Sequence, residues 1–493
     1  MNNFSKGTAR MLPMPFGVGL VAGGIAVTMA AFVGLLADSD EFATVRLLET
    51  ALGIASIVLG VAICYLQPRD VRITRVGAMS MFVAGWVAFT AVAIASFLLS
   101  GELGSLQNVI FEAVSASTTT GFTTVEDPQQ MSFALRFLRA AMPWATGLGV
   151  LLVAMGVLPA AIAGAELLPE RPLRGRSKID SSSLVAFRNT LVLYTLLTLA
   201  LFVGFALAGM RLFDALTYAL STASTGGMAN HANSIGHFDS QAVEWVAAGG
   251  MAAAGGNLLV VWWAVKGRFD SVWKSTELRL YLSLLLLGFL AVRFGGSGLG
   301  FSDSAVAITS MLSTTGLRSA NWAAGSEFTR AVLLVAAGIG AMSGSVGSGF
   351  RQARVSRIAL EVRRSLQNLL TPNRTNIVRV DGVAVDERSL ELTYGYLWMH
   401  AFTLAGVSVL LFAPGFDLVA TLSFTIGLVS NVGVLVNGDQ LSQHVELSSW
   451  TSIMAALAML LGRLSIYPVL LTIAGFFRWL ARFKPHKTIG ARA

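Results

Sequence analysis

Long apolar stretches alternate with short polar connections along the chain. Ten of these stretches approach the roughly 20 residues that a helix needs to cross a bilayer, so we expect ten membrane-spanning helices. The first stretch is too long for a secretory signal peptide and lacks its cleavage flank. The predicted spans lie near residues 16–36, 45–66, 77–99, 135–161, 185–209, 241–265, 278–294, 328–349, 391–413 and 447–477.

Four shorter apolar segments, each between two predicted spans, end in polar residues and a glycine. Their sequences are FEAVSASTTTGFTT at 111–124, LTYALSTASTGG at 216–227, AITSMLSTTGL at 307–317 and LSFTIGLVSNVG at 422–433. The parts at 107–118, 212–222, 303–313 and 417–429 are too short to cross a bilayer and predict re-entrant half-helices. One such ending alone is typical of an ordinary turn or helix cap, whereas four in equivalent places indicate a pore.

Aligned on Gly121, Gly226, Gly316 and Gly433, the endings are 105, 90 and 117 residues apart. We therefore predict a unit of span, half-helix, glycine loop and span that occurs four times around a central pore. Loops at membrane depth need protein neighbours or a wet cavity to satisfy their backbone. The predicted divisions are an N-terminal two-helix hairpin at 1–73 and repeats at 74–178, 179–276, 277–390 and 391–493.

The composition agrees with an all-α integral membrane protein, since 54% of the 493 residues are hydrophobic and 13% are charged. Basic residues concentrate in the segments that are cytoplasmic if the N-terminus lies inside: 1–15, 67–76, 163–188, 266–279, 350–390 and 478–493. These segments hold 27 of the 35 Lys and Arg residues but 10 of the 27 Asp and Glu residues. This asymmetry predicts cytoplasmic N- and C-termini. We interpret the net charge of +8 as a topology signal and lipid contact, with docking of a cytoplasmic partner as an addition, and not as a sign of nucleic acid.

The four glycine loops carry no charged side chain. A pore that selects by side-chain charge would show acidic or basic rings, so we expect backbone carbonyls and hydroxyls as ligands. Glycine lets consecutive carbonyls turn toward one axis, and four half-helix C-termini, each carrying about −0.5 charge, favour a cation. The candidate ion-binding residues of this selectivity filter are Thr119, Thr120, Gly121, Ser224, Thr225, Gly226, Thr314, Thr315, Gly316, Asn431, Val432 and Gly433.

A stretch rich in glycine and serine interrupts the predicted span 328–349. Each glycine costs about 1 kcal/mol relative to alanine inside a helix. We therefore expect an intramembrane loop below the third filter segment that gates the pore, with close helix packing through small residues as the alternative. The run GGMAAAGG at 249–256 is interpreted as packing. The candidate gate residues are Gly338, Gly340, Gly344, Ser345, Gly347 and Gly349, together with Arg463.

Arg463 lies in the middle of the last predicted span. A charge at that depth is costly and tends to face a wet cavity or a partner. We expect Arg463 to face the ion path and to hold the gating loop; a structural salt bridge or carbonyl contact is the alternative.

No constellation for catalysis or for a resident cofactor is visible in the sequence. The single cysteine, Cys64, excludes an intrachain disulfide and a thiolate cluster. GSVGSG lies within a span and follows no strand, unlike a phosphate-binding loop. The five histidines are scattered, at His231, His237, His400, His444 and His486. We do not expect an enzyme.

The chain resembles the TrkH/KtrB/HKT superfamily of potassium transporters, and its TrkH-type membrane subunits most closely because of the extra N-terminal hairpin. The resemblance extends over nearly the whole chain. The motifs that show it are FEAVSASTTTGF, AAGGMAAAGGN with STELRLYL, ITSMLSTTGL, GSVGSGFRQARVSRIALEVRRSLQNLLTPN, SNVG and MLLGRLSIYPVLL. It implies M1–P–M2 repeats as in potassium channels, K+ as the transported ion, and a homodimer in the bacterial inner membrane with one pore per protomer. Glycine in all four filter positions implies a preference for potassium.

By the same resemblance, the basic amphipathic stretch 351–366 would contact a ring of separately encoded, TrkA-like nucleotide-binding subunits. The sequence departs from the usual family pattern at Ala145-Thr146, where a glycine pair is usual, and at Phe350-Arg351, where an aliphatic-lysine pair is frequent. It also has Val434 in place of a proline.

We therefore predict potassium uptake through a carbonyl-lined filter gated by an intramembrane loop. A sodium-permeable cation transporter would share this pore. A secondary transporter of a small solute would instead show two inverted repeats, with half-helix N-termini facing the substrate.

Overall fold

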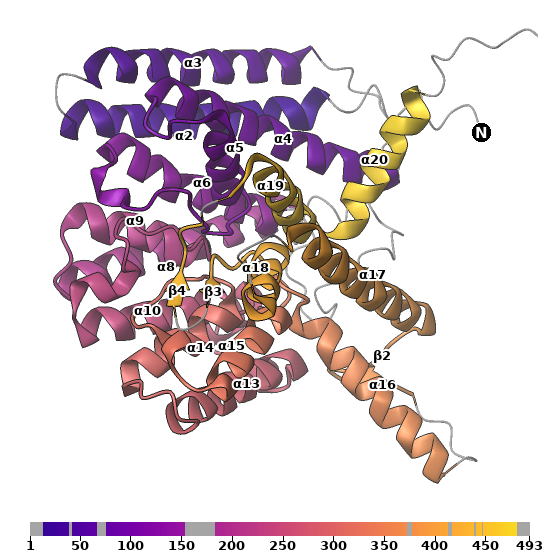
Figure 1. The fold of residues 1–493 in the computed structure, drawn as a ribbon. Coiled ribbons are helices and arrows are strands. Elements are labelled where there is room, and N and C mark those ends of the chain that lie inside the picture. The colour runs from indigo at the N-terminus through magenta and orange to yellow at the C-terminus, as the bar shows by residue number, and fades with distance from the viewer. Residues whose placement is uncertain are drawn as a thin grey trace, which may run out of the picture.

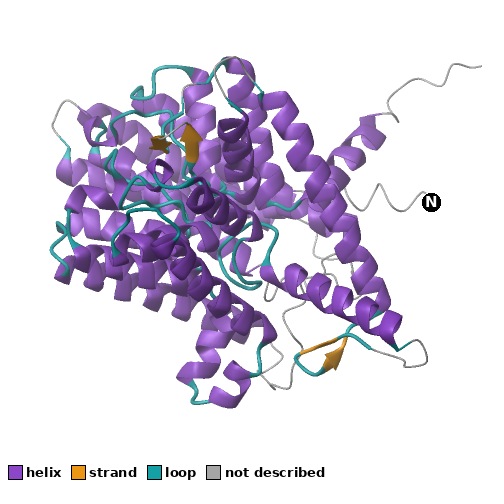
Figure 2. Ribbon diagram, turned by 60° about the horizontal axis from the view of Figure 1, so that its bottom comes forward, coloured by secondary structure: helices purple, strands orange, loops and turns teal. Residues whose placement is uncertain are grey.

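The structure is a computed structural model that describes residues 13–38, 42–66, 75–152, 183–371, 377–412, 417–437, 440–445 and 447–480. Helices account for most of it, and the strands lie in two separate antiparallel pairs (Figures 1 and 2). The predicted cytoplasmic segments 1–15, 67–76, 163–188 and 478–493 fall mostly outside the described residues. The orientation of the chain in the membrane and its division into five units stay predictions.

Each predicted span corresponds to a helix or a broken pair of helices. These elements are α2 (Pro13–Ala37), α3 (Ala43–Tyr65), α4 (Arg75–Ser100), α6 (Phe133–Leu152), α8 (Ser183–Leu207), α10 (Gln241–Ala254) with α11 (Leu258–Val265), α13 (Thr276–Phe294), α15 (Glu327–Ile339), α17 (Glu387–Leu411) and α19 (Ser449–Arg463) with α20 (Ile466–Leu480). Among the described helices, α2, α3, α4, α8 and α17 are each long and apolar enough to cross a membrane. The bent pair α19 and α20 makes a sixth when it is taken as one span.

The prediction of unbroken spans at 241–265 and 447–477 is wrong. The first is interrupted between α10 and α11, and the second bends by 112° between α19 and α20. At the second break Ser465 has a left-handed backbone, with φ +64°. Pro468 also lacks the N–H that would bond to the carbonyl of Leu464, so a continuous helix would lose a hydrogen bond at this turn. The predicted break of 328–349 is present, because α15 ends at Ile339.

All four predicted half-helices are present, with ends within two residues of the predicted ones. They are α5 (Leu106–Ser117), α9 (Leu212–Ala223), α14 (Phe301–Ser313) and α18 (Leu418–Ser430). The side chains of Ser105 and Asp417 cap α5 and α18 by accepting from the amides of Asn108 and Ala420, which satisfies one free donor at each start. Four sets of long helix, short helix, loop and helix follow one another along the chain, as the fold prediction requires.

The remaining elements lie in connections. They are the short helix α12 (Phe269–Trp273), the long helix α16 (Gln352–Leu370), the strands β1 (Arg379–Val380), β2 (Val383–Ala384), β3 (Leu435–Asn437) and β4 (Gln440–Ser442), and the 3-10 turns η2 (Pro128–Gln130), η4 (Ser234–Phe238) and η5 (Trp322–Ala324). Strand β1 pairs with β2, and β3 pairs with β4.

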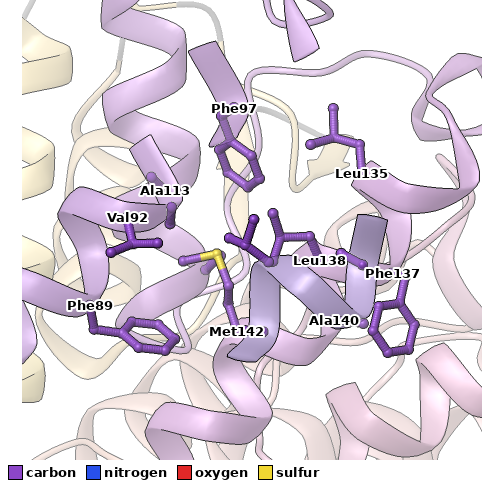
Figure 3. Close-up of a cluster of buried hydrophobic side chains, with 14 of the residues drawn as sticks. Phe89, Val92, Phe97, Ala113, Leu135, Phe137, Leu138, Ala140 and Met142 are labelled. Carbon is purple, nitrogen blue, oxygen red and sulfur yellow. The ribbon is translucent and has the colours of Figure 1, made fainter. Parts of the chain in front are cut away.

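An apolar core holds α5 between its two neighbouring long helices. Phe89 and Phe97 of α4 pack in one buried cluster with Leu138 and Met142 of α6, and Ala113 of α5 lies among them (Figure 3). Residues 111–117 of the short helix are all buried, so its C-terminal half is enclosed. A half-helix too short to be stable alone is thereby fixed by tertiary packing.

The N-terminal hairpin of α2 and α3 lies along one edge of the molecule, against α4 (Figure 1). Glycines bring its two helices close together. A β-carbon built on Gly24 would lie 2.5 Å from the carbonyl oxygen of Gly53, and one built on Gly60 would lie 2.5 Å from that of Gly17. Small residues at such contacts are typical of helix pairs in membranes.

Candidate functional site

The four glycine loops meet in one closed ring. A β-carbon built on Gly121 would lie 2.9 Å from the carbonyl oxygen of Gly226 in the second loop, and one built on Gly433 would lie 2.7 Å from that of Gly121. In the other two contacts of the ring, a β-carbon built on Gly227 would meet the carbonyl oxygen of Thr315, and one built on Gly316 would meet the amide nitrogen of Gly433. Each loop therefore touches the backbone of the next, which leaves no room for a side chain at these glycines.

The loops share one backbone conformation. Their first residues are left-handed, with φ +55° at Thr119, +51° at Thr225, +62° at Thr314 and +55° at Asn431. The amide of the next residue then donates to a carbonyl five positions back. These bonds are Thr120 to Ser115 (2.9 Å), Gly226 to Ser221 (2.7 Å), Thr315 to Ser310 (2.9 Å) and Val432 to Gly427 (2.7 Å). Each half-helix thus ends in a Schellman-type cap that turns the chain into the ring.

This shared geometry corrects the sequence alignment of the second loop by one residue. Gly227 is the counterpart of Gly121, whereas Gly226 takes the place of Thr120. Ser224 falls outside the ring, as the C-cap of α9, with its hydroxyl donating to the carbonyl of Leu220. Two adjacent glycines made the alignment ambiguous. The large apolar residue after each ring glycine, here Met228, is the signal that would have resolved it.

Hydroxyl and amide groups surround the ring. The hydroxyls of Thr118 and Thr120 lie 2.7 Å apart, and Nδ2 of Asn431 donates to Oγ1 of Thr120 (3.0 Å), which joins the fourth loop to the first. The hydroxyls of Thr119 and Thr225 are buried and have no hydrogen-bond partner in the described part of the chain. These hydroxyls are free to contact an ion or its water, so the ring offers oxygen ligands without a formal charge.

Every half-helix also holds the segment that leaves its loop, through the residue five positions after the left-handed one. In the first repeat the amide of Thr124 donates to Glu112 (3.2 Å). In the second and third, Asn230 donates to Asp214 (2.9 Å) and Ser319 donates to Asp303 (2.7 Å); in the fourth, the amide of Val436 donates to Ser423 (3.0 Å). The loops are therefore fixed at both ends.

One buried ion pair lies directly behind the first loop. Nε of Arg139 is 2.6 Å from Oε1 of Glu112, and both side chains are almost fully buried. Arg139 also donates to Oγ1 of Thr123 (3.0 Å) and to the carbonyl of Ala229 (3.4 Å) in the second repeat. Sequence reasoning missed this pair, whose two members belong to different helices.

Residues 340–351 form the predicted loop, which packs under the third filter segment. The amide of Ser348 donates to Oγ1 of Thr314 (2.8 Å), the left-handed residue of that segment. The amide of Met342 donates to the carbonyl of Gly255 (3.0 Å) at the break between α10 and α11, and the amide of Ser343 donates to Glu277 (2.5 Å). The loop, which follows α15 of the third repeat, thus contacts the break between α10 and α11 of the second repeat.

The candidate gate residues have different places in this loop. Gly340, Gly344 and Gly349 have positive φ, at +74°, +80° and +86°, so glycine is required there. A β-carbon on Gly347 would lie 2.6 Å from the carbonyl of Ser313. The remaining two candidates are Ser345, whose hydroxyl donates to the carbonyl of Met342, and Gly338, which lies inside α15 with open space beside it.

Arg463 reaches the loop from the end of α19. Its Nη1 donates to the carbonyl of Val346 (2.8 Å) and to Oγ of Ser348 (3.0 Å). The side chain is buried, and its Nε and Nη2 atoms have no hydrogen-bond partner among the described residues. The structure therefore brings Arg463 and the candidate gate loop together next to the third filter segment.

Helix α16 continues directly from this loop and projects from the body of the molecule, beside α17 (Figure 1). Nε2 of Gln352 donates to the carbonyl of Gly340 (3.0 Å), and the guanidinium of Arg354 lies 3.5 Å from the ring centroid of Tyr396 in α17. Arg364 pairs with Glu361 (2.8 Å) and with Glu387 at the start of α17. A displacement of α16 would thus act on the loop through covalent and hydrogen bonds.

Within the described ranges, no three His, Cys, Asp or Glu side chains are grouped so that they could hold a metal ion. The fourth ring segment, with Asn431 and Val432, contributes an amide and an apolar side chain where the others have hydroxyls or glycine.

Most of the chain, including the four glycine loops, is similar to known proteins. Residues 53–295 and 297–477 match the TrkH family, described as cation transport protein. The Trk system potassium uptake protein TrkG of Escherichia coli (strain K12) is 28% identical over 405 residues, which cover 80% of this chain and 83% of that protein. TrkI of Halomonas elongata, another Trk system potassium uptake protein, is 23% identical over 456 residues, 90% of this chain and 92% of that protein.

The fold also matches a solved structure, the potassium transporter TrkH from Vibrio parahaemolyticus. The TM-score is 0.83 at 23% identity, with 94% of this chain and 98% of that chain covered. Since the family match includes the second half of α3, all four glycine loops, the loop at 340–351 and Arg463, the chain is a multi-pass membrane protein that belongs to the TrkH family of cation transport proteins.

Proposed function

We propose that this chain is the pore subunit of a potassium uptake system in the bacterial inner membrane. The observation that carries the proposal is the closed ring of four glycine loops, in which backbone carbonyls and hydroxyls converge and no side-chain charge intervenes. Rings of carbonyls that replace the hydration shell are the means by which potassium filters select their ion. The relatives' names, Trk system potassium uptake proteins, support K+ as the cargo.

The electrostatics of the ring favour a cation. Helices α5, α9, α14 and α18 all end immediately before their loops, so their C-terminal dipole ends face the ring. Each contributes about −0.5 elementary charge. An ion that loses its water in this setting exchanges it for many neutral oxygens and four favourable dipole ends, whereas an anion would be repelled.

The loop at 340–351 is proposed as the gate. It lies against Thr314 and Ser313, at the end of α14, and it is held by the guanidinium of Arg463. Opening requires the loop to leave this position, which breaks its hydrogen bonds to Thr314 and to Arg463. The charge of Arg463 adds a barrier to cations while the loop is closed, since like charges repel in a medium of low dielectric constant.

We propose two partners, a regulatory subunit and a second copy of this chain. Helix α16 exposes Val362, Leu366 and Leu369 and carries basic residues, so it would suit the surface of a TrkA-like nucleotide-binding regulatory subunit. A homodimer in the lipid bilayer, with one pore in each protomer, is the proposed assembly. Light scattering of the purified protein tests the homodimer. Co-purification of α16 variants with the regulatory subunit tests the contact with that subunit.

A secondary transporter of a small solute is not favoured. That mechanism places half-helix N-termini at the substrate, whereas here the C-terminal ends of all four half-helices lead into the ring. A sodium-permeable transporter would use the same ring, so selectivity decides between the two ions.

The test is growth of a potassium-uptake-deficient bacterium at low potassium, with Gly121, Gly227, Gly316 and Gly433 each changed to Ser. We expect every substitution to impair growth, because a β-carbon at these positions meets the neighbouring loop. Gly406→Ser is the matched control, since Gly406 in α17 has no atom within 4 Å of its β-carbon position. Uptake of 42K+ and 22Na+ then reports the ion directly.

Full rescue by all four variants at normal expression would remove the ring as the ion path. Gly226→Ser adds a check on the corrected alignment. Its β-carbon would press on Pro143 of α6 rather than on another loop, so it should reduce the amount of folded protein but leave the K+/Na+ ratio of the remaining protein unchanged. Gly227→Ser should change that ratio.

A further inference from the structure

The segment 440–445 passes over the ring on the side where the loops leave it. It belongs to the fourth repeat, yet its backbone pairs with the first. The amide of Thr123 donates to the carbonyl of Gln443 (3.0 Å), the amide of Val445 donates to the carbonyl of Thr123 (3.0 Å), and Thr123 and His444 form a parallel bridge. Thr123 is two residues past the ring glycine Gly121, so this pairing fixes the segment at the mouth of the ring.

From this position the side chain of Gln443 reaches the other two repeats. Its Nε2 atom donates to the carbonyl of Gly316 (2.8 Å) and to the carbonyl of Gly227 (3.0 Å). The side chain is buried, at 6% exposure. Gly227 and Gly316 are the ring glycines of adjacent repeats, so one amide group joins two neighbouring strands of the ring. The two N–H donors of a carboxamide match two acceptors.

We propose that Gln443 is a specificity-determining residue, whose amide fixes the direction of the Gly227 and Gly316 carbonyls and thereby the size of the ion that the ring accepts. The inference rests on the proposed function, because it takes these loops as the filter. Gln443 touches the groups that would ligate the ion and acts on the ion through them.

Glycine makes such a fixed point necessary. Gly227 and Gly316 have φ of +67° and +84°, and without a β-carbon their peptide groups can rotate into several orientations of similar energy. A carbonyl oxygen has two lone pairs, so each oxygen can accept from Gln443 and still face the ion. The ring is then held at the diameter that suits one degree of dehydration, which is the property that separates K+ from the smaller Na+.

The segment that carries Gln443 is itself held by a half-buried cation, Arg318. Arg318, two residues after Gly316, donates to the carbonyl of Leu441 and to that of Ala232 (2.7 Å). Burial lowers the pKa of the Arg318 guanidinium below its usual range. The third repeat therefore contacts the segment through Arg318, and the first repeat contacts it through Thr123. These contacts hold the amide of Gln443 beside its two acceptors.

The experiment measures K+, Na+ and Cs+ flux through the full-length protein reconstituted in liposomes. Gln443→Leu removes both donors at similar volume, and Gln443→Glu keeps the shape but replaces donors by acceptors. We expect both variants to retain K+ flux and to lower the K+/Na+ ratio by about fivefold, the factor that one hydrogen bond typically contributes. Gln440→Leu is the matched control, because Gln440 lies in the same segment, 440–445, and is exposed; its ratio should equal that of the wild type.

Gly316→Ser in the same liposomes separates the two levels of inference. An altered ratio for Gly316→Ser together with wild-type ratios for both Gln443 variants would overturn the role of Gln443 and leave the filter intact. A wild-type ratio for Gly316→Ser would overturn the filter itself. If neither the Leu nor the Glu variant reaches the membrane, Gln443→Asn, whose amide is one methylene short of the carbonyls, carries the same expectation and the same refutation.

Discussion

Glu112 and Arg139 place two opposite charges directly behind the first glycine loop, in a part of the protein with almost no exposure to solvent. Such a pair is weak evidence for net stabilisation, because both ions are desolvated. Removing one member is different. The remaining charge is then buried without a partner, at a cost of about 3–5 kcal/mol, and it lies within hydrogen-bond reach of Thr123 and of the loop backbone.

Glu112→Gln should therefore lower both the thermal stability of the purified protein and its K+ uptake. The charge of Arg139 would remain, and the ligand of the Thr124 amide would be weakened. Thermal unfolding in detergent and 42K+ uptake measure the two effects. Glu327→Gln is the control, because Glu327 is 95% exposed in its pair with Arg330 and exposed pairs contribute about 0–1 kcal/mol. Equal midpoints for the two variants would contradict the assignment.

At the scale of single residues, the sequence predicted three of the four ring glycines but not the side chains that hold the ring. Gly121, Gly316 and Gly433 follow recognisable polar endings, so local pattern identified them. The alignment of Gly227 required backbone geometry. Gln443 could not be predicted, because its partners Gly227 and Gly316 are distant in the chain and a lone glutamine carries no local signal.

The glycine loop at 340–351 is the element that we propose as the gate. It has no regular hydrogen-bond ladder. Besides an internal bond from the amide of Ala341 to the carbonyl of Ser348 (3.2 Å), it contacts Thr314 of the third glycine loop, Gly255 at the break in the second repeat, and Arg463 of α19. An element held in this way can take a second position when a few of these contacts are lost, whereas a continuous helix could not.

Arg463→Ala should raise the basal K+ flux in liposomes several-fold without its regulatory partner. The substitution removes two hydrogen bonds to the loop, each worth about 1 kcal/mol or more when the donor is charged, and it removes a positive charge from the vicinity of the filter. Arg463→Lys should give an intermediate flux. Arg330→Ala, at the other end of α15, serves as the control. Unchanged or lowered flux at normal protein levels would count against a role in holding the gate closed.

The elements were largely predictable, because hydropathy and short polar endings are local signals. The four half-helices and the break after Ile339 follow from them. The 112° bend after Arg463 was not predicted: the sequence is apolar again at Leu464 and from Ile466 onward, and hydropathy averaging cannot register a proline within an otherwise suitable span. Contacts, rather than composition, decide where such a run turns.

Over the whole molecule, the N-terminal hairpin supports the repeats from one edge (Figure 1). Its polar end contributes a buried arginine, Arg46, which contacts Asp38 (3.2 Å), Glu102 (3.3 Å) and Ser132 (2.8 Å). Asp38 in turn accepts from the amide of Phe133 (2.7 Å) at the start of α6. The hairpin is therefore attached to the first repeat at the start of α6.

Gly53→Leu should lower the melting temperature but leave the K+/Na+ ratio of the folded protein unchanged. A β-carbon on Gly53 would meet Thr28 and would lie 2.8 Å from the carbonyl oxygen of Gly24, and forced overpacking of this kind costs about 1–3 kcal/mol. Gly406→Leu is the control, since that position has open space. A changed ion ratio in Gly53→Leu would show that the hairpin shapes the filter.

The ring is drawn from one polypeptide, and its four segments differ: Thr-Thr-Gly, Thr-Gly-Gly, Thr-Thr-Gly and Asn-Val-Gly. In a pore built from four identical subunits, one codon change alters every quadrant at once. Here a single substitution alters one quadrant and leaves three as they were. Natural variation can therefore change one segment of the ring at a time. A laboratory series of single and combined variants can measure how much each segment contributes to the K+/Na+ ratio.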